Sequence, residues 1–242
     1  MSKLTLVRLY HELLGTYGDQ GNAEVLMYRA KARGHSVQLV EVAPHEQVPT
    51  SGDVYLLGGG EDGPQAIALD MLHKNSGLNR AVENGAAVLA VCAGFQLIGT
   101  SLPDSEGNIV AGLGLVDAST IYTDDPRCVG ELFVTPADDA AGLLLTGFEN
   151  HQGRTQIGST MQPLGWVESG FGNGLLQAES DGQVPEGIVH GKVIGTYMHG
   201  PVLARNPQLA DRILESIVGK LDPFSDPLAE AFAQERREAI QR

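Results

Sequence analysis

A cysteine stands between an apolar run and a pair of small residues in the segment LAVCAGFQLIG, residues 89–99. The run before Cys92 predicts a buried strand, and the run after it predicts a helix. The small residues Ala93 and Gly94 suit the strained turn of a nucleophile elbow, where neighbouring bulk would clash. The helix N-terminus favours the thiolate over the thiol. The segment predicts a nucleophilic cysteine, and a small core residue is the competing interpretation.

A second feature with possible chemistry is the glycine triplet of residues 58–60, which also follows a predicted strand. Because glycine has no side chain, backbone N–H groups in such a loop can approach a developing oxyanion. A flexible turn without any chemical role could have the same glycine-rich sequence. The triplet indicates an oxyanion site only in combination with the elbow at Cys92.

A cysteine nucleophile needs a base, and the chain has seven histidines. His199 ends the run GKVIGTYMHGP just past a predicted strand, which is also the position of Cys92. His151, in GFENHQGRT, is the alternative because it follows an apolar strand and lies among polar residues. The remaining five are predicted at helix ends, in polar loops, in turns or near the end of the first strand: His11, His35, His45, His73 and His190.

Composition narrows the classes of protein to consider. With 242 residues the chain can bury a sizeable core without disulfides. It carries 16 Lys and Arg against 30 Asp and Glu, a net charge of −14, which argues against nucleic acid and anionic membranes as partners. Charged residues interrupt the N-terminal segment, so we expect a cytoplasmic protein without membrane insertion. The second cysteine, Cys128, lies too far from Cys92 for a CxxC metal site and is assigned to packing.

The first hundred residues alternate between two patterns. Strands are predicted at 3–9, 37–42, 53–57 and 86–91, and helices at 22–33, 64–72 and 78–84. Strands that are apolar on both faces and separated by helices indicate an α/β fold with a mostly parallel sheet. In such sheets the ligand crevice lies beyond the carboxyl ends of the strands, where Cys92 is predicted.

The second half is richer in glycine and short apolar runs. Runs at 129–135, 143–148, 187–189 and 193–197 predict added antiparallel strands. A helix is predicted at 207–218, followed by a final helix or tail after Pro227. The absence of a GxxxxGK[ST] string argues against nucleotide hydrolysis by a P-loop.

These motifs resemble those of class I glutamine amidotransferases, in the cobyric-acid-synthase-like branch. VYLLGGGED resembles the glycine loop of that family, LAVCAGFQLIG its nucleophile elbow, GLGLVDAST the following segment and IGTYMHGP its catalytic-histidine strand. The strings GTYGDQGNAEVL and GFENHQGRT narrow the similarity to glutaminase subunits of peptidoglycan synthesis. The resemblance covers nearly the whole chain, with residues 1–220 as an amidotransferase domain and 221–242 as a helical extension or tail.

The resemblance implies a reaction at the side-chain amide of L-glutamine. Cys92 would attack the amide carbon, releasing ammonia and leaving a γ-glutamyl thioester that water hydrolyses to glutamate. His199 would act as base and then as acid. Backbone N–H groups of Gly59, Gly60 and Ala93 would hold the oxyanion.

Two further site expectations follow from the resemblance. Arg127, in DDPRCVGEL, matches the arginine that binds the α-carboxylate of glutamine, and Arg154 is the competing anchor. Many family members carry a glutamate two residues after the histidine, but here Pro201 stands there. A Cys–His dyad is therefore expected, with Glu149 or a backbone carbonyl as alternative groups to orient the imidazole. Slow hydrolysis by the isolated chain is expected for the same reason.

The resemblance also implies a partner. No ATP-using domain precedes the amidotransferase motifs, so a separate MurT-like ligase would form a heterodimer with this chain and amidate the D-glutamate α-carboxylate of lipid II. ATP and magnesium would belong to that ligase, and no cofactor or metal is expected here. Other acceptors, such as a corrinoid precursor, and a non-catalytic regulatory role on a ligase remain open. A DJ-1-like thiol sensor would also place a cysteine at a strand end, but would not explain His199 or Arg127.

Overall fold

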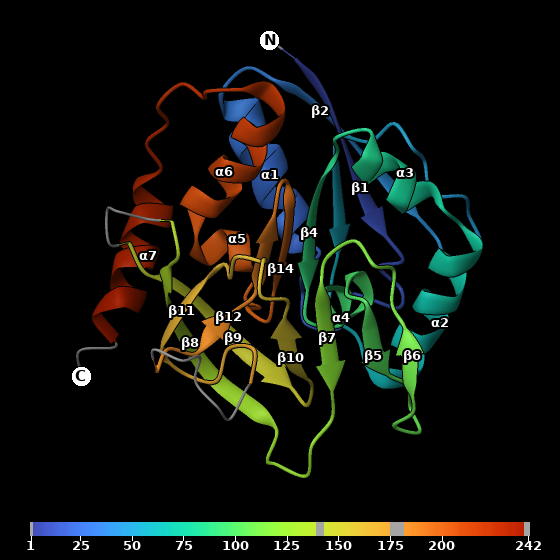
Figure 1. The fold of residues 1–242 in the computed structure, drawn as a ribbon. Helices are drawn as coiled ribbons and strands as arrows, with labels where there is room; N and C mark the ends of the chain where they lie inside the picture. Colours follow the sequence, from blue (N-terminus) through green and yellow to red (C-terminus); the bar gives the residue numbers. More distant parts are fainter. Residues whose placement is uncertain (1, 139–142, 175–181, 240–242) are drawn as a thin grey trace.

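A six-stranded sheet forms the centre of the computed structural model, which describes residues 2–138, 143–174 and 182–239 (Figure 1). Its strand order is β13-β14-β4-β3-β1-β2, and only β13 runs antiparallel to its neighbour. The strands span Lys3–Leu9 (β1), Ser36–Val42 (β2), Val54–Leu57 (β3), Ala87–Val91 (β4), Ile188–His190 (β13) and Val193–Thr196 (β14). The α/β fold with a mostly parallel sheet is thereby confirmed.

The core of this sheet consists of the three neighbouring strands β14, β4 and β3. Every residue of these strands is buried. Such strands can exist only where helices cover both faces of the sheet, which explains their uninterrupted apolar sequences. The active-site candidates follow directly after these three strands, so a rigid base positions them.

Helices cover the two faces of the sheet, as Figure 1 shows. One face carries α1 (Gly21–Ala32), α5 (Val202–Arg205) and α6 (Pro207–Val218). The other carries α2 (Asp62–Lys74), α3 (Gly77–Glu83) and α4 (Ala93–Ile98). A last helix, α7 (Pro227–Ala239), lies within the predicted C-terminal extension and contacts α5 and β9. Residues 240–242 of that extension lie outside the described part.

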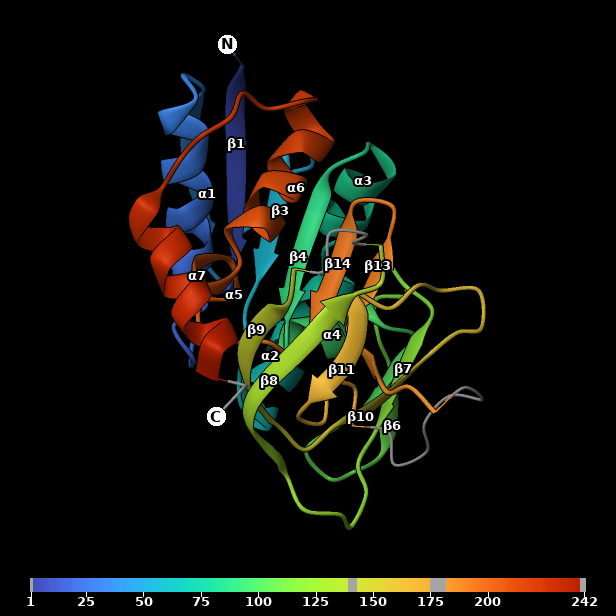
Figure 2. The same cartoon turned by 90° about the vertical axis from the view of Figure 1, so that its left-hand side faces the viewer.

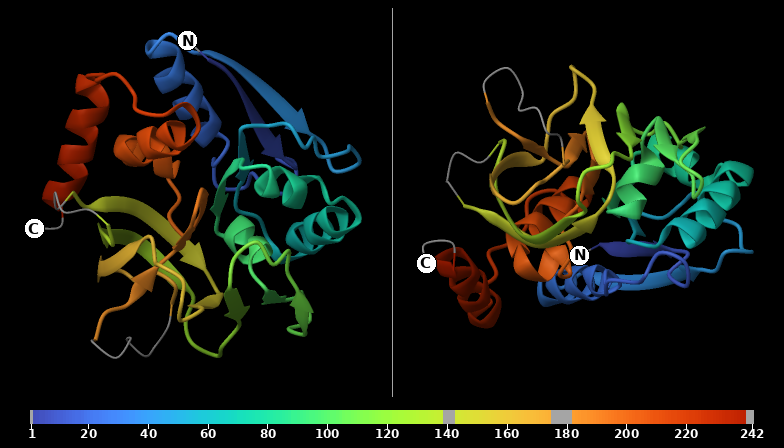
Figure 3. Two further views of the ribbon diagram at one scale, coloured as in Figure 1. Left: turned by 45° about the horizontal axis from the view of Figure 1, so that its top comes forward. Right: turned by 90° about the horizontal axis from the view of Figure 1, so that it is seen from below.

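Two smaller sheets lie beyond the carboxyl ends of the central strands (Figures 1 and 2). One has the order β10-β7-β5-β6 and the other β12-β11-β8-β9. Their strands span Ser101–Pro103 (β5), Ile109–Ala111 (β6), Ala118–Ile121 (β7), Cys128–Pro136 (β8), Leu145–His151 (β9), Arg154–Ile157 (β10), Gly165–Ser169 (β11) and Pro185–Glu186 (β12). The view from below in Figure 3 shows both sheets beside the central one.

The antiparallel strands predicted for the second half are present, with one correction. β8 and β9 pair antiparallel, but β14 pairs in parallel with β4 and so belongs to the central sheet. This difference matters because β14 carries the chain to His199. Within the described residues, no helix is both long and apolar enough to cross a bilayer.

Candidate active site

Cys92 occupies a strained turn between β4 and α4. Its backbone has φ 53° and ψ −106°, a left-handed conformation that is rare for a residue with a side chain. The Cys92 N–H donates to the carbonyl of Thr196 at 2.8 Å, and the Gly94 N–H donates to the carbonyl of Gly58 at 3.2 Å. A Cβ on Gly94 would lie 2.8 Å from the Leu57 backbone oxygen, so only glycine fits there. The turn has the geometry of a nucleophile elbow.

The other cysteine has a different setting. Cys128 lies in β8 with no exposed surface, and burial raises the pKa of its thiol to about 11. It is therefore a neutral thiol at physiological pH. This environment suits a packing residue and not a nucleophile.

His199 is held beside the elbow by β9. Its N–H donates to the Phe148 carbonyl at 2.8 Å, and the Phe148 N–H donates back to the His199 carbonyl at 3.0 Å. The imidazole is buried, and its Nδ1 lies 3.0 Å from Oδ2 and 3.1 Å from Oδ1 of Asp19. Its Nε2 has no hydrogen-bond partner among the described residues. One ring nitrogen is thus oriented by a carboxylate while the other is free to exchange a proton.

Asp19 corrects the expectation of a dyad. It lies in the loop between β1 and α1, is 5% exposed, and stands 180 positions before His199 in the chain. Sequence reasoning missed it although it belongs to the string GTYGDQGNAEVL. Pro201 occupies the position two after His199, and the carboxylate at the imidazole comes from this distant loop instead. With Asp19 inside the chain, the reason to expect a slow isolated glutaminase no longer holds.

Asp19 also changes the role of Gly59. The Gly59 N–H donates to Asp19 Oδ2 at 2.8 Å, so it is not available to an oxyanion. The expectation that Gly59 supplies an oxyanion donor is wrong for this reason, and the residue instead positions the carboxylate. The N–H groups of Gly60 and Ala93 donate to no other described residue, and they remain the predicted donors.

The charge state of His199 follows from its neighbours. Burial disfavours the charged ring, but the hydrogen bond to Asp19 and the influence of the Cys92 thiolate outweigh it and raise the pKa of His199 to about 10. The imidazole is therefore protonated at neutral pH. Its charge stabilises a thiolate on Cys92, and its proton is available for a leaving group.

This raised pKa predicts a pH-dependent stability. The unfolded histidine titrates near 6.5, so its contribution to folding is complete below that pH and is lost as the pH rises toward about 10. We expect the free energy of unfolding to fall over this window by an amount on the order of a few kcal/mol. Urea unfolding of the wild type and Asp19→Asn from pH 6 to 10 measures it. Parallel pH dependences for the two proteins would contradict the assignment.

The ring of Tyr17 packs against the imidazole of His199. Its ring centroid lies 4.5 Å from that of His199, with the planes tilted by 40°. Its hydroxyl donates to Glu61 Oε1 at 3.1 Å and accepts from Asn150 Nδ2 at 3.4 Å. Burial and the neighbouring Glu61 carboxylate raise the pKa of Tyr17, so the phenol stays protonated.

Arg127 reaches the same place from the loop that directly precedes β8. Its Nε donates to Asn150 Oδ1 at 2.5 Å and its Nη2 to the Asn150 carbonyl at 3.2 Å. The Cys92 Sγ lies 4.0 Å from that same carbonyl oxygen. An exposed guanidinium therefore stands beside the thiol, as an anchor for a carboxylate requires.

The competing anchor, Arg154, is placed differently. It is 4% exposed and donates to the carbonyls of Gln152 at 2.8 Å and Pro126 at 2.6 Å. These bonds join the turn between β9 and β10 to the loop that precedes β8. The guanidinium of Arg154 is therefore already bound to backbone carbonyls, and Arg127 is the better candidate for binding substrate.

The two remaining alternatives lie in a separate buried cluster. They are His151, the competing base, and Glu149, the competing group to orient His199. His151 Nδ1 bonds the Gly153 carbonyl at 2.9 Å, and its ring stacks on Tyr197 at 3.7 Å. Burial lowers the pKa of His151. Glu149 accepts the N–H groups of Phe171 and Gly172 at 2.7 and 3.0 Å and therefore does not orient His199. Both residues support the structure behind the site.

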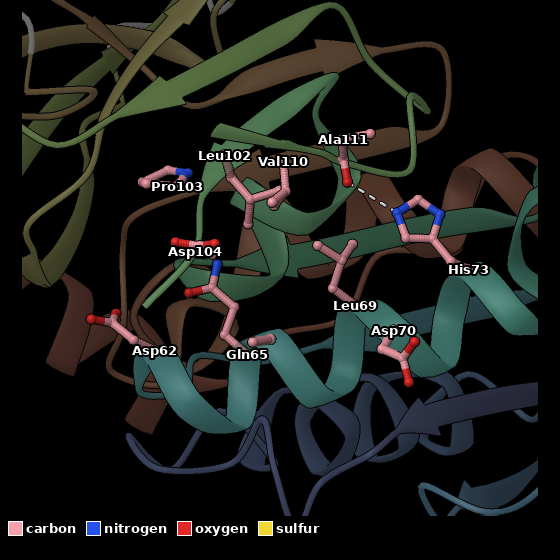
Figure 4. A pocket seen from close by; sticks show the side chains of 11 residues that line it. Asp62, Gln65, Leu69, Asp70, His73, Leu102, Pro103, Asp104, Val110 and Ala111 are labelled. Carbon is pink, nitrogen blue, oxygen red and sulfur yellow. Dashed lines mark hydrogen bonds between the residues drawn. The ribbon is translucent and has the colours of Figure 1, made fainter. Parts of the chain in front are cut away.

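A pocket of about 350 Å³ lies between α2 and the strands β5 and β6 (Figure 4). Leu69, Leu102 and Val110 project into it, and His73 closes one end by a bond to the Ala111 carbonyl at 2.9 Å. Its lining does not include Cys92 or His199. The pocket is thus distinct from the site at the elbow.

Comparisons with known proteins agree with this geometry. Residues 5–207 match the model of the CobB/CobQ-like glutamine amidotransferase domain. The chain is 34% identical to the lipid II isoglutaminyl synthase subunit GatD of Streptococcus pneumoniae, with 96% of this chain and 90% of that protein covered. For GatD of Staphylococcus aureus the identity is 35%, over 89% of this chain and 84% of that protein.

More distant relatives share parts of the chain. It is 31% identical to a cobyric acid synthase of Rhodobacter capsulatus, over 68% of this chain but only 32% of that protein. A crystal structure of a glutamine amidotransferase superposes with a TM-score of 0.56 at 17% identity, over 87% of this chain and 98% of the other, which supports the fold. The resemblance seen in the sequence is confirmed: the chain belongs to the CobB/CobQ-like glutamine amidotransferase family.

Proposed function

We propose that this chain is the glutaminase subunit of a lipid II isoglutaminyl synthase. It hydrolyses L-glutamine and supplies the ammonia to a MurT-like, ATP-dependent ligase, which amidates the D-glutamate α-carboxylate of lipid II. The observation that carries the proposal is the setting of His199. Asp19 holds its Nδ1, its Nε2 has no partner among the described residues, and its side chain interacts with Cys92, which lies in a strained turn. The similarity to GatD over nearly the full length of both chains supports the choice of acceptor.

The residues divide the reaction into two steps. The Cys92 thiolate attacks the amide carbon of glutamine, and the oxyanion forms next to the N–H groups of Gly60 and Ala93. Protonated His199 gives its proton to the departing nitrogen, so ammonia leaves and a thioester remains. Neutral His199 then takes a proton from water, the hydroxide attacks the thioester, and glutamate leaves as the thiolate is restored. Asp19 keeps the ring oriented through both steps.

A ligase partner follows from the chemistry of the product. Ammonia released into water at neutral pH is mostly protonated and no longer nucleophilic. Delivery therefore requires a complex that shields the route between the two active sites. ATP, magnesium and lipid II would be bound by the partner.

Substitution of Arg127 tests substrate anchoring. We expect Arg127→Ala to raise the KM for glutamine by about 10- to 100-fold, because a charge-assisted bond to the α-carboxylate is lost. The value of kcat should change much less. Arg80→Ala, an exposed arginine on α3, is the matched control. An unchanged KM in steady-state ammonia release would exclude Arg127 as the anchor.

The proposed function is tested in the reconstituted complex. The chain is co-purified with the candidate ligase, and amidation of lipid II is followed with glutamine and ATP. The wild type should amidate, whereas Cys92→Ala should amidate only when ammonium salt replaces glutamine. Failure of the wild-type complex on lipid II, combined with activity on a corrinoid acid, would reassign the acceptor. Equal activity of wild type and Cys92→Ala with glutamine would point to a regulatory role.

A further inference from the structure

We propose that Glu186 is a positioning residue for glutamine hydrolysis, because it fixes the end of the strand that lies between the two catalytic side chains. The inference rests on the proposed function and adds to it a residue that acts through its neighbours. Glu186 ends β12 and is fully buried. Burial of an ionisable group is costly to the folded state, so its contacts indicate what the group is needed for.

The side chain of Glu186 reaches across to the end of β14. Its Oε1 accepts the Thr196 hydroxyl at 2.5 Å and the Tyr197 N–H at 2.9 Å. Its Oε2 is buried and has no hydrogen-bond partner among the described residues. One oxygen of the carboxyl group therefore makes both contacts with β14 and the residue that follows it.

Thr196 connects Glu186 to the elbow and to the residue before the histidine. The Thr196 carbonyl accepts the Cys92 N–H at 2.8 Å. The Thr196 hydroxyl, which donates to Glu186, accepts the Met198 N–H at 3.0 Å. Met198 directly precedes His199 in the chain. A shift of this one threonine would therefore move the nucleophile and the histidine relative to each other.

The backbone on both sides of Glu186 is itself held in place. The N–H of the buried Asn173 donates to the Pro185 carbonyl at 2.9 Å, and the Gly187 N–H donates to Asn173 Oδ1 at 2.7 Å. Gly187 has φ 62°, and a Cβ there would collide with the backbone oxygen of Gly195 in β14. Glycine thus allows the chain after Glu186 to approach β14 closely, which makes Glu186 a fixed anchor for that strand.

The positioning role needs a hydrogen-bond acceptor and not a negative charge. Burial raises the pKa of Glu186 to about 7, although the hydrogen bonds from Thr196 and Tyr197 favour the charged form. Near neutral pH both protonation states are therefore populated, and each keeps an oxygen that can accept the two bonds. A glutamine side chain at this position would retain such an oxygen, whereas an apolar side chain would not.

The test compares variants of the full chain in its complex with the ligase. We expect Glu186→Leu, which fills the space without an acceptor, to lower kcat for glutamine about 10- to 100-fold and to change KM by less than about twofold. Glu186→Gln should stay within about threefold of the wild type, because its amide oxygen accepts both bonds. Asp53→Ala is the matched control. Its carboxylate accepts the Thr5 N–H at 2.7 Å before the amino end of β3, so its loss should lower the melting temperature but not kcat.

A double-mutant cycle tests the contact with Thr196 directly. Thr196→Val removes the hydroxyl but keeps the carbonyl that bonds Cys92, and it should lower kcat as well. If Glu186 acts through Thr196, the loss in the double variant Glu186→Leu/Thr196→Val should be at least about fivefold smaller than the product of the two single losses. Losses that multiply would contradict the inference. Should Glu186→Leu fail to fold, Thr196→Val and its conservative counterpart Thr196→Ser test the same contact from the other side.

The outcomes separate this inference from the proposed function. Equal kcat losses in Glu186→Leu and Glu186→Gln, or no loss in Glu186→Leu, would overturn the positioning role. If the wild type released no ammonia from glutamine, the proposed function would fail, but alkylation of Cys92 by iodoacetamide would still report on the pairing of its thiolate with His199. The alkylation rate at pH 7 should fall at least about tenfold in Glu186→Leu and be restored in Glu186→Gln. An unchanged rate in Glu186→Leu would overturn the inference.

Discussion

Cys92→Ala is expected to lower the kcat for glutamine hydrolysis by about 10⁴- to 10⁶-fold, because no other group can form the thioester. The second cysteine cannot replace it: Cys128 is fully buried and burial raises the pKa of its thiol to about 11. Ammonia release from purified complexes measures the loss. The ligase half should remain active with added ammonium salt, which shows that the complex still assembles.

Cys128→Ala is the control for this experiment. It removes a thiol from β8 but leaves the elbow unchanged, so we expect activity near that of the wild type. Circular dichroism verifies that both variants are folded. Hydrolysis by Cys92→Ala at more than about one hundredth of the wild-type rate would show that the nucleophile lies elsewhere.

Asp19→Asn is expected to lower kcat by about 10²- to 10⁴-fold with little change in KM. Asparagine can occupy the same space, but its amide does not stabilise an imidazolium and can favour the wrong tautomer of His199. The pKa of His199 should fall as well, because the hydrogen bond to Asp19 is the main effect that raises it against burial. The alkaline limb of the kcat–pH profile should consequently move to lower pH.

The kcat–pH profile distinguishes a positioning role of Asp19 from a general loss of structure in the Asp19→Asn variant. A variant that merely unfolds in part would lose activity at every pH without moving the limb. Asp70→Asn on the exposed side of α2 provides a carboxylate control and should keep the wild-type profile. An Asp19→Asn profile that overlays that of the wild type would remove Asp19 from the reaction.

The sequence was sufficient to predict the elements on which the site is built. The strands β3 and β4 are short and buried along their whole length, and each is followed by small residues at the turn. This pattern predicted both the parallel sheet and the elbow at Cys92. The strands β5 and β6 have three residues each, too few to show a period, so they were not predicted.

Pairs of similar residues could not be separated without three dimensions. His151 and His199 both follow apolar strands, but only His199 meets a carboxylate that leaves its second nitrogen free. Arg127 and Arg154 both lie in polar segments, and burial against backbone carbonyls distinguishes Arg154. Asp19 lies in a string that indicated the family, but its role was not predicted because its partner is 180 positions away. Such contacts depend on how the loops meet at the sheet edge.

The central claim is that Cys92 becomes acylated by the γ-carbonyl of glutamine. Rapid quenching of the complex in acid, followed by peptide mass spectrometry, measures the thioester directly. The account predicts one glutamyl adduct on the peptide that contains Cys92, formed in the wild type and absent from Cys92→Ala. An adduct on Cys128, or steady ammonia release with no adduct on Cys92 at any quench time, would contradict it.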